Sequence, residues 1–358
     1  MSVIMPSTTK SVYIKHFVDA GVPEEEDFEI VESQVDTSSL EDGQVVVQVL
    51  YMSVDPYLRG GMKSQGAPKD AGRRLIEGFV SGKVAASKNP KWTVGDFFGA
   101  NLPFSTLQVI SPDSKRMWKL TGLVSEETLS YGVGVLGMPG STSYAGISGI
   151  LRPNPDSDHK ETIFISAASG AVGSIAGQIA KNVYSLNTIG SAGGVEKVDL
   201  LKKSFGYDHA IDYKSLPEGG EREAMVAELK KYAPEGIDMY FENVGGYHFS
   251  AAFDSLRAHG RIALCGTISN YNDVNPKFPE VNISSMIYTQ QRIEGFLCFP
   301  YLAGQKGNFL KDMSAWIKEG KVSSIEETFY EGVEAWPKAF RSLFVGTHKN
   351  KGKVVVRI

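Results

Sequence analysis

The hydrophobic pattern divides the chain into a β-rich part and a part in which apolar runs alternate with helical segments. In the first part, to about residue 130, Gln44–Tyr51 is a β-branched run with partial alternation between turn residues. Further short strands are expected near Phe79–Val84 and Thr106–Ile110. Frequent glycines separate these segments, which is typical of a barrel-like fold with many turns.

After Leu129, the pattern changes to short apolar runs and helical segments of 10 to 15 residues. The predicted strands are Thr162–Ser166, Asn187–Ser191, His209–Tyr213, Ile237–Asn243 and Arg261–Cys265. The predicted helices between them are Val172–Ser185, Glu196–Phe205, Glu221–Tyr232 and Gly246–Leu256. This alternation indicates a buried parallel sheet. The end of the chain, with predicted helices Asn308–Glu319 and Ala335–Phe344 and strand Lys353–Ile358, resembles the first part again.

Composition narrows the class of protein. The 358 residues, 42% of them hydrophobic, suit two globular domains. A net charge of −4 lacks the basic excess of a nucleic-acid binder, and no apolar run is long enough to span a membrane. The N-terminal segment lacks a secretory pattern, and two cysteines, Cys265 and Cys298, cannot build a disulfide framework. We therefore expect a cytoplasmic protein.

The sequence shows no pattern of metal ligands. None of its six histidines is paired with another at helical ligand spacing, and there is neither H-E-x-x-H nor C-x-x-C. We expect no metal site.

A glycine loop between a predicted strand and helix is the most informative segment. Its core is Ala168-x-Gly170-x-x-Gly173, followed by Gly177. Small residues there allow a sharp turn, close approach of the backbone to a pyrophosphate, and tight packing of helix on strand. Such packing alone also favours small residues, so a purely structural loop is the alternative. The β/α context favours dinucleotide binding.

The end of the second predicted strand favours NADP over NAD. An NAD enzyme places a carboxylate there for the ribose hydroxyl. This chain has Ser191-Ala192-Gly193-Gly194, and Lys197 follows in the next helix. A strand end without a carboxylate, followed by a lysine, suits the extra phosphate of NADP. The alternative is that Lys197 is only a solvated residue on the polar face of an amphipathic helix.

Several motifs together resemble one family. Ser53-Val54-Asp55-Pro56-Tyr57-Leu58-Arg59 resembles the S-x-D-P-Y-x-R signature of the zinc-free medium-chain dehydrogenase/reductases, in the branch of leukotriene B4 dehydrogenase/prostaglandin reductase and the alkenal double-bond reductases. The loop AASGAVGS, the segment Phe241–Gly246 and the segment Cys265–Tyr271 match the same branch in the same order.

The resemblance implies an α/β fold with a Rossmann-type NADP-binding domain at 131–314. It also implies a β-rich GroES-like catalytic domain at 1–130 plus 315–358, completed by the C-terminus. The implied NADP(H)-binding residues are Gly170, Ala171, Val172, Gly173, Lys197, Tyr213, Asn243, Cys265, Gly266, Thr267, Ile268, Ser269, Tyr271, Phe296, Leu297, Cys298 and Asn350. A homodimer is also implied by the family.

The implied reaction is NADPH-dependent reduction of the C=C bond of an α,β-unsaturated aldehyde or ketone, by hydride transfer to the β-carbon. Tyr271 is the first candidate to hydrogen bond the carbonyl oxygen or relay a proton, and Tyr57 is the second. Either tyrosine has a structural alternative, as a loop cap or as a packing residue. Asp55-Pro56 is expected to form a rigid turn, and Arg59 a structural ion pair.

Two other functions remain open at this stage: an NADPH-dependent quinone oxidoreductase and a non-catalytic NADPH-binding protein. Two segments also depart from the family pattern. Gly99–Ile110 lacks the expected Gly-Trp-x-Glu-Tyr, and Lys63–Ile76 is unfamiliar. Both are expected to border the substrate pocket, so the family's substrate specificity is not carried over.

Overall fold

The chain folds into two compact units. The computed structural model describes residues 8–64, 72–113, 116–304, 308–324, 327–346 and 350–358, so part of the unfamiliar Lys63–Ile76 segment lies outside it. Unit 1 comprises Met1–Gly137, Asn272–Val274 and Glu327–Ile358. Unit 2 comprises Met138–Tyr271 and Asn275–Glu326.

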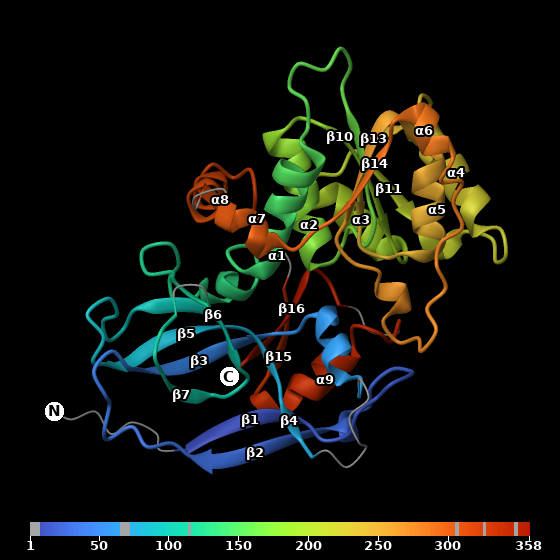
Figure 1. The fold of residues 1–358 in the computed structure, drawn as a ribbon. Coiled ribbons are helices and arrows are strands. Elements are labelled where there is room, and N and C mark those ends of the chain that lie inside the picture. Colours follow the sequence, from blue (N-terminus) through green and yellow to red (C-terminus); the bar gives the residue numbers. More distant parts are fainter. Residues whose placement is uncertain (1–7, 65–71, 114–115, 305–307, 325–326, 347–349) are drawn as a thin grey trace. The chain divides into compact units, whose positions relative to one another are not determined.

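Unit 1 is built on two β-sheets (Figure 1). The larger sheet has the order β15-β16-β3-β5-β6-β8, with β7 also paired to β3. Its strands are β3 (Val45–Ser53), β5 (Glu77–Ser87), β6 (Phe97–Pro103), β7 (Leu107–Ile110), β8 (Met117–Lys119), β15 (Glu327–Glu331) and β16 (Lys353–Arg357). The smaller sheet consists of β2 (Phe28–Gln34), β1 (Thr8–Ile14) and β4 (Arg74–Leu75). The prediction of a β-rich domain completed by the C-terminus is confirmed, because β16 pairs antiparallel with β3.

Strand β3 is the centre of this unit, which explains why its sequence alternates only partially. It pairs with β5, β7 and β16, and Val45, Val46 and Val47 are all buried. A strand covered on both faces gains free energy from apolar side chains at every position. Helix α9 (Trp336–Arg341) supplies Trp336 and Phe340 to the same core, where their rings stack with centroids 5.0 Å apart.

The S-x-D-P-Y-x-R segment is tied into unit 1 by a buried ion pair. The Asp55 carboxylate lies 3.2 Å from the Lys353 ammonium, which also donates to the carbonyls of Val54 and Val354 at 2.8 Å each. Ser53 Oγ donates to the second carboxylate oxygen. Among the described residues, Arg59 does not form the ion pair that we expected. Arg59 is buried and donates instead to Asn272 Oδ1 and to the Gly21 carbonyl, both at 3.0 Å.

Unit 2 contains the expected parallel sheet, in the order β11-β10-β9-β12-β13-β14 (Figure 1). The strands are β9 (Thr162–Ile165), β10 (Asn187–Ala192), β11 (His209–Asp212), β12 (Ile237–Glu242), β13 (Leu256–Leu264) and β14 (Arg292–Gly295). The helices are α1 (Met138–Tyr144), α2 (Ala171–Gln178), α3 (Val195–Lys203), α4 (Glu221–Tyr232), α5 (Gly246–Asp254), α6 (Ser285–Thr289), α7 (Cys298–Gly304) and α8 (Asn308–Lys318). This doubly wound order confirms the Rossmann-type prediction, and strand order reverses between β9 and β12, where such folds bind ligands.

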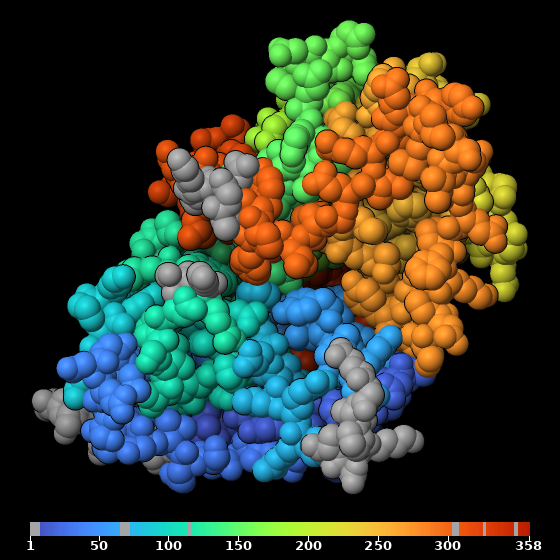
Figure 2. All heavy atoms as spheres, viewed as in Figure 1, coloured from blue at the N-terminus to red at the C-terminus, as the bar shows by residue number. Residues whose placement is uncertain are grey.

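In the sheet of unit 2, the start of one strand differs from the prediction and another strand was missed. Strand β13 begins at Leu256 rather than Arg261, because its pairing with β12 jumps from Leu256 to Arg261 around an irregularity that contains His259 at φ 63°. Edge strand β14 was not predicted. Figure 2 shows residues of its region, in orange, at the molecular surface.

Candidate active site

The predicted site residues of unit 2 follow the carboxyl ends of its strands. The glycine loop follows β9, Lys197 lies in α3 after β10, and Tyr213 directly follows β11. Asn243 follows β12, Cys265–Tyr271 follow β13, and Phe296–Cys298 follow β14. Because the strands are parallel, all these residues lie along one edge of the sheet.

The glycine loop leaves a cradle that a larger side chain would fill. Gly170 is the N-cap of α2, and the first intrahelical bond runs from the Ser174 amide to the Gly170 carbonyl at 2.9 Å. The amides of residues 171–173 therefore have no acceptor within the helix. A Cβ on Gly173 would lie 2.5 Å from the Ala167 carbonyl oxygen, so that position requires glycine. These free amides at a helix N-terminus fit a pyrophosphate.

Gly177 has a packing role. A Cβ there would lie 2.2 Å from the Tyr207 ring, whose hydroxyl donates to the Gly173 carbonyl at 2.7 Å. The small residues of the loop therefore have two different roles. Gly177 allows the helix to pack closely against Tyr207, whereas Gly170 and Gly173 shape the cradle.

Two lysines gather beside the end of β10. A Cβ on Gly193 would lie 2.9 Å from Lys214 Cε and 2.9 Å from the Tyr213 hydroxyl. Burial and the neighbouring Lys214 charge lower the pKa of Lys197. Within the described ranges, neither lysine has an acidic ion-pair partner. Two uncompensated cations beside a phenol suit a phosphate dianion.

The carboxylate of Asp212, at the end of β11, is engaged by backbone amides. Its Oδ1 accepts from the amides of Gly194 and Lys214 at 2.8 and 3.0 Å. Asp212 therefore holds the turns after β10 and β11 together. Sequence reasoning missed Lys214 and Asp212. The signal was their position at the end of β11, next to Tyr213.

Tyr213 packs edge-on against His248, at 5.4 Å between ring centroids. His248 is buried in α5, and within the described part of the chain neither of its ring nitrogens has a hydrogen-bond partner. Burial lowers the pKa of His248 to about 4. The imidazole is therefore neutral at pH 7.

This histidine makes the protein sensitive to acid. The folded pKa lies below the ordinary 6.5, so the unfolded chain takes up the proton first as pH falls. Between pH 6.5 and 4, the wild type should lose about 3 kcal/mol of unfolding free energy relative to His248→Phe. Urea unfolding of both proteins across this range measures the difference. Parallel pH curves would contradict it.

Tyr271 ends the segment that follows β13. Burial raises the pKa of its phenol, and a hydrogen bond from the Thr267 backbone partly opposes that rise. Nearby, burial raises the pKa of Cys265 to about 12, so its thiol stays protonated and is no nucleophile.

The remaining predicted residues are placed as follows. Phe296 packs edge-on against Phe241 at 6.1 Å, Leu297 is exposed and Cys298 is buried. Tyr57 and Asn350 belong to unit 1. Tyr57 lies in the 3-10 helix Pro56–Met62, 43% exposed and edge-on to Phe79. The side-chain amide of Asn350 donates to Ser342 Oγ at 2.7 Å.

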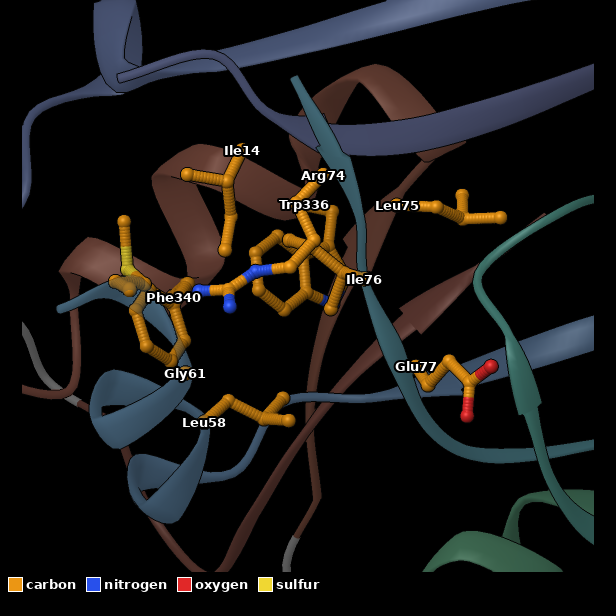
Figure 3. Close-up of a pocket in the computed structure, with 10 residues that line it drawn as sticks. Ile14, Leu58, Gly61, Arg74, Leu75, Ile76, Glu77, Trp336 and Phe340 are labelled. Carbon is orange, nitrogen blue, oxygen red and sulfur yellow. The ribbon is translucent and has the colours of Figure 1, made fainter. Parts of the chain in front are cut away.

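Unit 1 also contains a hollow of about 440 Å³ (Figure 3). Its walls are mainly apolar, and Trp336 and Phe340 among them are fully buried. Glu77 at its rim is paired with Arg116 at 2.7 Å. None of the predicted site residues lines it, so it is a gap in the core packing rather than the candidate active site.

The described residues form neither a metal-binding group nor a membrane-spanning helix. No three His, Cys, Asp or Glu side chains there form a group that could hold a metal ion. In the same residues, no helix has the length and apolar character needed to cross a membrane.

Comparison with known proteins identifies the relatives of the chain. Residues 11–120 match a family described as the N-terminal domain of oxidoreductase, and residues 171–317 match one described as zinc-binding dehydrogenase. A 2-alkenal reductase (NADP(+)-dependent) from Nicotiana tabacum is 39% identical over 98% of both chains. Prostaglandin reductase 1 from Oryctolagus cuniculus is 36% identical over 95% of this chain and 90% of its own.

A solved structure agrees with these sequence matches. CurA from Vibrio vulnificus, in complex with NADPH, superposes with a TM-score of 0.82 at 31% identity, covering 97% of this chain and 98% of its own. The chain therefore belongs to the medium-chain dehydrogenase/reductase family. Within that family it lies in the branch that contains 2-alkenal reductase and prostaglandin reductase.

Proposed function

We propose that this protein is an NADPH-dependent reductase of the C=C bond in α,β-unsaturated aldehydes and ketones. The observation that carries the proposal is the site in unit 2, which combines a pyrophosphate cradle with Lys214 beside Gly193 and with Lys197, whose pKa the Lys214 charge lowers. The 39% identity to an NADP(+)-dependent 2-alkenal reductase supports the substrate class. CurA, with NADPH bound, supports the cofactor.

The described residues fit NADPH. Residues 170–173 would hold the pyrophosphate, and Lys197, Lys214 and Tyr213 the 2′-phosphate. The segments after β12, β13 and β14 would hold the remainder. When bound, the cofactor supplies a hydride for the substrate's β-carbon.

Tyr271 would stabilise the charge that develops on the substrate's carbonyl oxygen. Its phenol is neutral at pH 7, because burial raises its pKa above the ordinary value of a phenol. A donor oriented in advance lowers the barrier more than one that must reorganise during reaction. The same hydroxyl can deliver a proton to the α-carbon. Tyr57 is our second candidate for a residue that contacts the substrate. It belongs to unit 1, which we take to be the catalytic domain, and we take unit 2 to be the NADP-binding domain.

The reaction is tested by initial rates with one medium-chain 2-alkenal and either NADPH or NADH, in buffer containing a chelator. We expect a clear preference for NADPH. Lys197→Ala should raise KM for NADPH by roughly 10- to 100-fold, because a charge-assisted contact is lost, and should leave KM for NADH unchanged. Lys202→Ala, on the same helix, is the matched control. No turnover with either cofactor would overturn the proposal.

A quinone oxidoreductase is the second candidate, since it shares this fold and cofactor. The ratio of enal to quinone turnover, measured on the same protein, separates the two activities. NADPH binding without turnover of an enal, an enone or a quinone would indicate a non-catalytic protein.

We further propose that the protein is a homodimer formed through the β14 side of unit 2. Strand β14 ends the sheet, so one of its edges is unpaired within the sheet. Nearby, Phe278 and Tyr288 are 83% and 86% exposed, and Ile283 and Ile287 are also exposed. An open strand edge next to clustered apolar side chains is typical of an interaction surface.

Light scattering on a size-exclusion column tests the dimer. The wild type should elute with the mass of two chains, and Ile287→Asp/Tyr288→Asp as one, because two carboxylates would be desolvated at the interface. Val94→Asp replaces an exposed apolar residue of unit 1 and should remain dimeric. A wild type of one-chain mass would contradict the proposal.

We also propose a cytoplasmic location. Both cysteines are free thiols in the structure, as expected in a reducing compartment. Fluorescence microscopy of a tagged full-length chain tests it.

A further inference from the structure

A buried polar cluster lies beneath the segments proposed to hold the cofactor. Its members are Ser166, directly after β9, and Glu242, the last residue of β12, which are the two strands flanking the reversal of strand order. Both side chains are completely buried. The Ser166 hydroxyl donates to Glu242 Oε1 at 3.1 Å.

Ser166 joins the end of β9 to the end of β12. Its hydroxyl oxygen accepts from the Asn243 amide at 2.9 Å and from the Tyr240 hydroxyl at 3.0 Å. The Asn243 side-chain amide in turn donates to the Ser166 carbonyl at 2.8 Å. The start of the glycine loop and the start of the loop after β12 are therefore bonded in both directions.

Glu242 holds the loop that follows it. Its Oε1 accepts from the Val244 and Gly245 amides at 2.5 and 2.9 Å, in addition to the Ser166 hydroxyl. Its Oε2 has no partner within the described residues. Burial raises the pKa of this carboxyl.

The backbone carries the same connection into the segment that contains Tyr271. The Glu242 carbonyl accepts from the amides of Cys265 and Gly266 at 3.0 and 3.1 Å. The Val244 carbonyl accepts from the Ser269 amide at 3.0 Å and from its hydroxyl at 2.6 Å. The three segments after β9, β12 and β13 are thus joined through one short stretch of chain.

We propose that Ser166 and Glu242 are positioning residues for NADPH, which hold these three segments at the spacing that the cofactor requires. Neither side chain is accessible to a ligand, so both act through the loops that they bond. This inference rests on the proposed function, because it assumes that NADPH binds at this edge of the sheet.

NADPH binding to the whole protein without substrate tests the role directly. We expect Ser166→Ala and Glu242→Ala to raise the dissociation constant for NADPH by roughly tenfold, equivalent to about 1.4 kcal/mol. At saturating NADPH, kcat should change much less than KM. Glu242→Gln keeps an accepting oxygen at the position of Oε1, so it should bind NADPH nearly as well as the wild type.

Ser255→Ala is the matched control, since its hydroxyl donates only to the Ala251 carbonyl at 2.8 Å in the same unit. If Glu242→Ala does not fold, hydrogen exchange is measured on Ser166→Ala instead. The amides of Asn243, Val244 and Gly245 should exchange faster in Ser166→Ala than in the Ser255→Ala control. Folded Ser166→Ala and Glu242→Ala proteins with wild-type affinity would overturn the positioning role. A wild type that fails to bind NADPH would overturn the proposed function itself.

Discussion

Asp55→Asn should lower the free energy of unfolding by about 3 to 5 kcal/mol, because it leaves the Lys353 ammonium buried with only carbonyl partners. The substitution preserves the shape of the side chain, removes its charge and replaces one accepting oxygen with an NH2 donor. Burial already lowers the pKa of Lys353, and the Asp55 carboxylate opposes that shift. Urea unfolding at pH 7 measures the loss.

Two further variants separate the buried pair from ordinary surface charge. Glu77→Gln breaks the Glu77–Arg116 pair, whose side chains are about half exposed, and should cost less than about 1 kcal/mol. Asp55→Leu combined with Lys353→Met should recover most of the stability, since apolar residues often replace a buried pair without loss. Equal losses for Asp55→Asn and Glu77→Gln would show that the buried pair has no special weight.

Tyr271→Phe should lower kcat for a 2-alkenal by roughly 100- to 1000-fold, the usual effect of removing one oriented donor. The ring remains, so the dissociation constant for NADPH should change little. Tyr232, the last residue of α4, stacks on His209 of β11 and serves as the control. Tyr232→Phe removes its hydroxyl and should leave the rate unchanged. Stopped-flow measurement of NADPH oxidation gives the rate of the chemical step.

The pH dependence of this rate provides a second check. Because burial raises the pKa of Tyr271, the phenol should stay protonated, and the wild-type rate should persist, up to at least about pH 10. A kcat unaffected by Tyr271→Phe would assign the tyrosine to loop structure and make Tyr57 the next candidate.

Local sequence was sufficient to predict elements whose determinants are close together in the chain. The glycine loop is an example, since Gly173 is required by the carbonyl of Ala167, six residues before it. Five of the six strands of unit 2 were also predicted, because a strand buried on both faces needs apolar residues at every position. The predicted end of a strand was wrong where pairing with a neighbouring strand determines it. Leu256 is an example, because it joins β13 only through its pairing with Ile237 of β12.

The site itself shows the same division. Lys197 was predicted from the absence of a carboxylate after β10, whereas Lys214 was missed because its closeness to Gly193 depends on the adjacency of β10 and β11. The Asp55 motif was recognised, but its partner Lys353 lies 298 residues away. Arg59 was assigned an ion pair, although folding brings it neutral oxygens of Gly21 and Asn272.

The sequence by itself determined the two kinds of architecture, the dinucleotide loop and the family. These depend on periodicity and on short motifs, which a linear chain displays directly. Only the tertiary structure decided that Ser166 and Glu242 meet, because strands 76 residues apart pair side by side. The burial and the hydrogen bonds of Ser166 and Glu242 depend on neighbours that are distant in the sequence. Burial raises the pKa of Glu242, and the hydrogen bonds position the loops that we propose to hold NADPH.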